Sequence, residues 1–229
     1  MRKGSIISFL LLMVAILSGC GGAASKTSND FSDVIIEIRE VPAVAHRRGL
    51  VRLACSNKPA GGFGDVDIGK IVNYGKKIWQ IILENRPVTN LCFDYANAFP
   101  KGVAKPADLS GFSQLHYKTY NYTAKNVFGG VLADVTYSVV HQFGGSYDGK
   151  GKFLATVSIV PGNVSVAIGN RLDFDTTKIV VTNVGTDAEP VASIVMETQL
   201  RLSNPFDTVH KTQIFQVSGN SPEVVASMP

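Results

Sequence analysis

Residues 131–143 read Val-Leu-Ala-Asp-Val-Thr-Tyr-Ser-Val-Val-His-Gln-Phe. Apolar side chains recur at every second position from Val131 to Val139, and polar residues such as Asp134 and Thr136 stand between them. Successive side chains of a strand point to opposite faces, so this period of two is typical of a β-strand with one buried face. The stretch therefore predicts a strand packed against a core.

The same alternation recurs through the second half of the chain, between turn signals rich in Gly, Asn, Asp and Pro. One such signal, Pro161-Gly162-Asn163, separates two of the predicted strands. About seven closely spaced strands are the signature of an antiparallel sandwich or barrel. The other predicted strands are 34–38, 50–54, 112–122, 153–159, 164–172, 179–184, 192–202 and 209–217.

Residues 66–85 show a helical period instead. Ile68, Ile71 and Val72 begin an apolar stripe with spacings of three and four that continues to Ile82, opposite a polar stripe. Asp65 or Asp67 can cap the start of a helix, and Pro87 would stop it. We therefore predict one amphipathic helix packed on the β domain; a membrane-surface helix and a partner-binding helix are the alternatives.

The predicted fold is mainly β: an antiparallel β-sandwich, or a barrel, of about 7–9 strands with this one α-helix packed against it. Residues 94–111 contain Pro100, Gly102, Pro106 and Gly111, which interrupt any regular period. They predict a long loop and a place to look for a binding surface.

The N-terminus carries an export signal. Arg2 and Lys3 precede an apolar run that ends in Leu17-Ser18-Gly19-Cys20, and this run is shorter than the ~20 residues that span a bilayer. Small residues directly before a cysteine resemble the lipobox of bacterial lipoproteins. The resemblance covers about the first 20 residues and implies that Cys20 is acylated and becomes the first residue. An ordinary signal peptide and a short membrane anchor are the alternatives.

This resemblance divides the chain. Residues 1–19 are the predicted signal peptide, 20–33 the lipidated cysteine and a flexible tether of small residues, 34–220 a single β-rich domain, and 221–229 a C-terminal tail. In the family, an Asp after the lipidated Cys retains the protein at the inner membrane. Gly21 stands there instead, so the resemblance implies a lipid-anchored protein of the outer membrane.

The charge balance argues against a nucleic-acid partner. Removal of the signal peptide takes away two of the 22 Lys and Arg residues, which lowers the net charge from +4 to +2. With Cys20 acylated, Cys55 and Cys92 remain, and in an oxidising envelope they form a candidate disulfide. Two buried free thiols are the alternative.

No motif carries a strong prediction of catalysis. Residues 64–70 match the spacing of a phosphate-binding loop, but Ile71 stands where a hydroxyl must reach magnesium. HExxH, CxxC and GxSxG are absent, and a lone strand histidine is more often structural than catalytic. The sequence therefore predicts no catalytic residues, no metal site and no cofactor.

Tyrosines offer the candidate binding surface, because each gives a large contact area with a polar tip. Tyr120 and Tyr122 share a face of their predicted strand, and Tyr95 and Phe99 lie in the predicted loop. We expect these four residues to bind an envelope protein or a glycan. The alternative is that strands simply favour tyrosine.

The leading functional prediction is a non-enzymatic envelope lipoprotein that is held at the membrane by its N-terminal lipid and has a binding or structural role. One alternative is a hydrolase of envelope polymers that uses loop carboxylates such as Asp94 and Asp108. Another is a carrier of apolar ligands.

Overall fold

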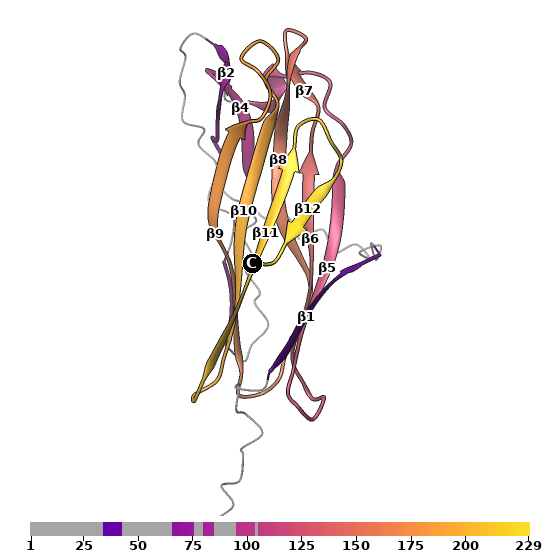
Figure 1. Ribbon diagram of the computed structural model, residues 1–229, viewed down its shortest axis with the longest axis vertical. Coiled ribbons are helices and arrows are strands. Elements are labelled where there is room, and N and C mark those ends of the chain that lie inside the picture. The colour runs from indigo at the N-terminus through magenta and orange to yellow at the C-terminus, as the bar shows by residue number, and fades with distance from the viewer. Residues whose placement is uncertain (1–33, 43–65, 76–79, 85–94, 104) are drawn as a thin grey trace, which may run out of the picture.

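A computed structural model describes residues 34–42, 66–75, 80–84, 95–103 and 105–229. These residues form twelve strands in two sheets, and every paired strand runs antiparallel to its neighbour (Figure 1). The predicted mainly β, antiparallel fold is thereby confirmed. No helix among the described residues is long and apolar enough to cross a membrane.

The first sheet has the strand order β1–β5–β6–β8–β4–β2, with the short β7 paired to β8. Residues 116–166 build its centre from successive antiparallel partners, as the alternating pattern predicts. Its strands are β1 (Ile35–Val41), β2 (Asp67–Val72), β4 (Ala96–Lys101), β5 (His116–Lys125), β6 (Val131–Gln142), β7 (Gly145–Tyr147) and β8 (Lys150–Val166).

The second sheet has the order β12–β11–β10–β9–β3. Four of its five strands follow one another along the chain, and β3 is added from the N-terminal half at the edge beside β9. Its strands are β3 (Gln80–Glu84), β9 (Arg171–Asn183), β10 (Ala192–Ser203), β11 (Thr208–Ser218) and β12 (Val224–Ser227).

The two sheets face each other across one hydrophobic core. Tyr137 of β6 contacts Phe174 of β9 and Phe215 of β11, with ring centroids 5.0 and 6.2 Å apart. Buried side chains of both sheets belong to a single cluster, which includes Ile159 and Met196. Burial of a large apolar side chain contributes about 1.5–3 kcal/mol, so this shared core is the main stabilising element of the fold.

Residues 150–166 form one long strand where the sequence predicts two. Pro161-Gly162-Asn163 is a β-bulge instead of a turn: Tyr137 of β6 lies opposite Pro161, and Val135 lies opposite Val164. A bulge inserts an extra residue into one strand and bends it, while the chain continues along the sheet. Proline is tolerated at such a position because the ladder is already interrupted there.

The predicted helix at 66–85 is wrong. Its described parts are β2 and β3, which pair with β4 and β9, and the described residues contain no α-helix. The Ile and Val residues that suggested a helical stripe are also good strand formers, and pairing with neighbouring strands outweighs their periodicity. Gly75 permits a close approach of backbones, since a Cβ there would lie 2.2 Å from the carbonyl oxygen of Tyr95.

The predicted loop at 94–111 and tail at 221–229 also need correction. The first contains β4, whose residues Ala96 to Pro100 are all buried, and the short 3-10 helix η2 (Pro106–Asp108). The second contains β12, which pairs with Ile214–Val217 of β11. Ordered structure therefore extends past residue 220. The predicted signal peptide, the tether and the predicted strand 50–54 lie outside the described residues.

Candidate functional site

The predicted tyrosine surface is largely interior. Tyr122 and Phe99 are fully buried and Tyr120 is 4% exposed, while Tyr95 is half-buried just before β4. Tyr120 and Tyr122 do share one face of β5, as predicted, but it is the face that meets the second sheet. The opposite face carries Thr119, Asn121 and Thr123, a polar alternation that already marked the tyrosine side as the inner one. These four residues therefore do not form an exposed binding surface.

The buried tyrosines form a cluster with β6 and β11. Tyr137 lies opposite Tyr120 in the sheet, and their rings stack with centroids 5.8 Å apart. The hydroxyl of Tyr137 donates a hydrogen bond across the core to the side-chain oxygen of Gln213. We call Tyr120, Tyr122, Tyr137 and Gln213 the tyrosine layer. It places a side-chain hydrogen bond between the two sheets inside their shared hydrophobic core.

Burial keeps the hydroxyls of the tyrosine layer protonated. Burial, with a contribution from Glu40, raises the pKa of Tyr120 to about 12. Burial also raises the pKa values of Tyr122 and Tyr137 well above their usual value of 10. The hydroxyls of Tyr120 and Tyr122 have no hydrogen-bond partner among the described residues. The three tyrosine hydroxyls of the layer therefore stay protonated and neutral near neutral pH.

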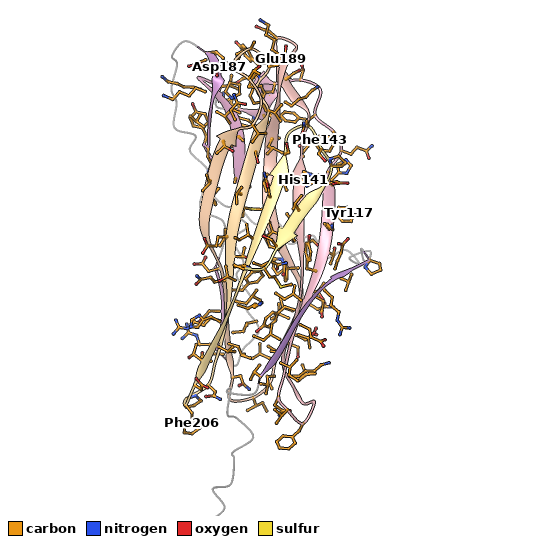
Figure 2. The ribbon with its side chains drawn as sticks, in the orientation of Figure 1. Tyr117, His141, Phe143, Asp187, Glu189 and Phe206 are labelled. Atoms are coloured by element: carbon orange, nitrogen blue, oxygen red, sulfur yellow. The ribbon has the colours of Figure 1, made fainter. Side chains whose placement is uncertain are left out.

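A second aromatic group lies near the other end of the same strands. His116 and His141 are paired across β5 and β6, with ring centroids 6.0 Å apart, and Phe143 contacts His116 at 5.0 Å. His141 is fully buried, and Figure 2 labels its position beside Phe143. Burial lowers its pKa below 6.5; a backbone group of Ser221 opposes this shift, and His116 adds to it. The neutral imidazole is therefore the form that the fold favours.

This preference predicts a pH-dependent stability. The unfolded chain binds a proton at His141 near pH 6.5 and the folded chain does so only at lower pH, so stability present above pH 6.5 is lost as the pH falls. We expect a loss of up to about 1.4 kcal/mol per pH unit between pH 6.5 and 5. Urea unfolding across this range would measure it.

The matched variants are His141→Leu and His210→Ala, since His210 is exposed on β11. His141→Leu should flatten the pH dependence in this range, whereas His210→Ala should leave it in place. An unchanged slope in His141→Leu would contradict the assignment to this residue.

Of the remaining candidate residues, Asp108 alone lies in the part of the chain that the structure describes. Asp108 is exposed on η2, and its proposed partner Asp94 lies outside the described residues, as do Cys55 and Cys92. Within the described ranges, no group of three or more His, Cys, Asp or Glu side chains is placed to hold a metal ion. The hydrolase and the disulfide therefore stay predictions.

Three turns at one end of the domain carry exposed bulky side chains that the sequence reasoning missed. Phe128 lies in the β5–β6 turn, Ile168 in the β8–β9 turn and Phe206 in the β10–β11 turn, and they are 79%, 98% and 80% exposed. We call these three residues the tip cluster. Each follows or precedes an asparagine by two positions, a turn signal beside a large apolar residue that was readable in the sequence.

The directions of the strands bring the three turns to one end of the domain. β5, β8 and β10 run toward it and β6, β9 and β11 run away from it (Figure 1). The backbone N–H of Ala167 donates to the carbonyl of Leu132, which ties the β8–β9 turn to β6. β9 and β10 pair up to Arg171 and Ser203, next to the third turn. Phe206 is visible at this extremity in Figure 2.

Comparison with protein-family models, with curated proteins and with solved structures finds no match to this chain.

Proposed function

We propose that this protein is a non-enzymatic lipoprotein of a bacterial cell envelope, anchored in the outer membrane through acylated Cys20. Its β domain is held near the membrane and binds an envelope protein or a glycan. The lipobox-like stretch Leu17-Ser18-Gly19-Cys20 supports the anchor. The position at which the chain enters the domain supports the placement of the β domain near the membrane.

That position is the observation that carries the proposal. Ile35, the first residue of β1, lies opposite Lys125, which borders the β5–β6 turn. The chain coming from Cys20 therefore joins the domain at the end that holds the tip cluster. Residues 21–33 can span at most about 45 Å, whereas the seventeen residues of β8 extend over roughly 55 Å. The anchor thus keeps the tip end close to the membrane.

The opposite part of the domain is then the one presented to partners. Leu115, just before β5, and Tyr117, near its start, are 56% and 60% exposed. Tyr117 lies away from Phe206 of the tip cluster (Figure 2). An exposed tyrosine beside an exposed leucine offers apolar area with a hydrogen-bonding tip. In this proposal they replace the buried tyrosines as the contact residues for a protein or glycan.

Substitution of Cys20 tests the anchor. In Cys20→Ala the thiol that would take the acyl chains is gone, so we expect the protein to leave the outer-membrane fraction, while Ser25→Ala in the tether should stay there. Membrane fractionation measures the distribution, and mass spectrometry of the wild-type N-terminus should find an acylated cysteine. Membrane retention of Cys20→Ala equal to that of the control would refute the anchor.

A further inference from the structure

We infer that the tip cluster is a membrane-docking surface: Phe128, Ile168 and Phe206 insert into the interface of the lipid bilayer to which the chain is tethered. This inference deepens the proposed function and rests on it. It gives the domain a second attachment to the membrane and a fixed orientation on it.

The first support is the exposure of three large apolar side chains on three separate turns at one end. Single exposed apolar residues are normal on a protein surface, but apolar residues that gather in one region mark an interaction site. Val127 and Val131 flank Phe128 and are also about half exposed, at 53% and 49%. The apolar surface at this end therefore extends beyond the three tips.

The second support is that asparagine side chains in these turns accept hydrogen bonds from backbone N–H groups of the same turn. The side-chain oxygen of Asn126 accepts hydrogen bonds from the N–H groups of Phe128 and Gly130, at 3.1 and 2.8 Å. Asn204 does the same for Phe206 and Asp207, at 2.8 Å each. A backbone N–H without a partner is costly in an apolar medium, so these bonds prepare the turns for contact with lipid.

The β8–β9 turn is also closed by hydrogen bonds within the turn. The N–H of Asn170 and its side-chain amide both donate to the carbonyl of Ala167, at 3.1 and 3.3 Å. Ile168, which is 98% exposed, lies in this hydrogen-bonded turn. All three apolar side chains are displayed by ordered turns, so little conformational entropy is lost when they insert.

The third support is the tether, which selects lipid over other occupants. Residues 21–33 join the domain beside the β5–β6 turn, so an acylated Cys20 brings the bilayer within about 45 Å of the tip cluster. The acyl chains hold the chain at the membrane but do not orient the domain at the end of the tether. Insertion of the tip cluster adds a contact at the end where the tether joins the domain, and this contact fixes the orientation of the domain.

The charges near the tips do not favour one lipid headgroup. Asp207 lies beside Phe206, Lys125 borders the β5–β6 turn, and Arg171 forms an ion pair with Asp173 at 2.9 Å. Positive and negative groups are thus mixed at this end. We therefore expect docking on zwitterionic vesicles, with little dependence on salt.

Depth-dependent tryptophan quenching tests the inference on the acylated full chain. In a Trp79→Phe background, Phe128→Trp, Ile168→Trp and Phe206→Trp each place one reporter in the tip cluster. Tyr117→Trp places a matched reporter at an exposed site away from it. The proteins are reconstituted on phosphatidylcholine vesicles with brominated acyl chains, and retention is measured by flotation.

The expected result is quenching of the three tip reporters and little quenching of the Tyr117→Trp control. In the double variant Phe128→Ser/Phe206→Ser, the Ile168→Trp reporter should lose most of its quenching. Each phenylalanine contributes roughly tenfold to the ratio of docked to undocked domain. Flotation of this variant should persist, because the acyl chains are unchanged.

Several results would overturn the inference. Flotation without preferential quenching of the tips would remove the docking surface and leave the lipid anchor standing. Quenching of the double variant equal to that of its parent would show that the phenylalanines do not drive docking. Unquenched tips that crosslink to an envelope protein in cells would assign this end to a protein partner. Failure of the acylated chain to float would overturn the anchor and the docking together.

Discussion

Replacement of Gly219 by alanine is expected to destabilise the protein by about 3 kcal/mol. The added Cβ would lie 2.1 Å from the carbonyl oxygen of Lys152, a backbone atom that cannot rotate away. Gly219 is also held on both sides: its N–H donates to Ala192 at 2.7 Å, and its carbonyl accepts from Gly144 at 2.9 Å. Relief of the clash must therefore strain the junction between the two sheets or break one of these bonds.

Gly149→Ala is the matched control for this substitution. Gly149 has a φ of +75° in the turn after β7, but apart from its two chain neighbours no residue has an atom within 4 Å of the position that a Cβ would occupy. Its cost should stay at about 1–2 kcal/mol, from the backbone conformation alone. Urea unfolding of both variants against the wild type measures the difference. A Gly219→Ala variant no less stable than Gly149→Ala would show that the sheets adjust to the added methyl group.

The second large effect is expected in the tyrosine layer, where one Tyr→Phe substitution should destabilise the fold and another should not. Tyr137→Phe removes the donor to Gln213, which is only 2% exposed, and leaves a buried amide oxygen without this partner. We expect a loss of about 2 kcal/mol. Tyr122→Phe removes a buried hydroxyl that has no partner among the described residues, so it should be neutral or stabilising by up to about 1 kcal/mol.

Both substitutions keep the aromatic ring, so packing is nearly unchanged and the comparison isolates the hydroxyl groups. Denaturant unfolding measured side by side should separate the two variants by about 2–3 kcal/mol. Equal destabilisation by Tyr122→Phe would mean that its hydroxyl takes part in a stabilising interaction, which would argue for a polar ligand or water in the core.

The period of two was a reliable guide wherever one face of a strand is buried and the other is polar. It correctly located β6 and β10, because alternation there directly reflects the two faces of a sheet. It failed in β4, whose residues Ala96 to Pro100 are buried on both faces, so that no polar alternation remains. It also failed at Pro161, where a bulge has the same residue signature as a turn.

The candidate site was harder to predict, for reasons of three-dimensional placement. That Tyr120 and Tyr122 share a face follows from spacing, but whether that face is covered depends on β11, which lies about 90 residues further along the chain. The tip cluster is the converse case. Phe128, Ile168 and Phe206 are scattered in the sequence, and only the common direction of their strands brings them to one end.

The strand pairing also means that the strands do not pair in the order in which they are synthesised. From β5 to β12 each strand pairs mostly with a near neighbour in the chain, so this half can zip up from local hairpins. β1, β3 and β4 leave the ribosome first, yet their partners are β5, β9 and β8. β3 and one edge of β4 must therefore stay unpaired until β9 and β8 have been made, whereas β2 can already pair with β4. A chain with this delay remains partly unfolded for longer. Such a delay is compatible with the export that we propose, in which the chain crosses a membrane before it folds.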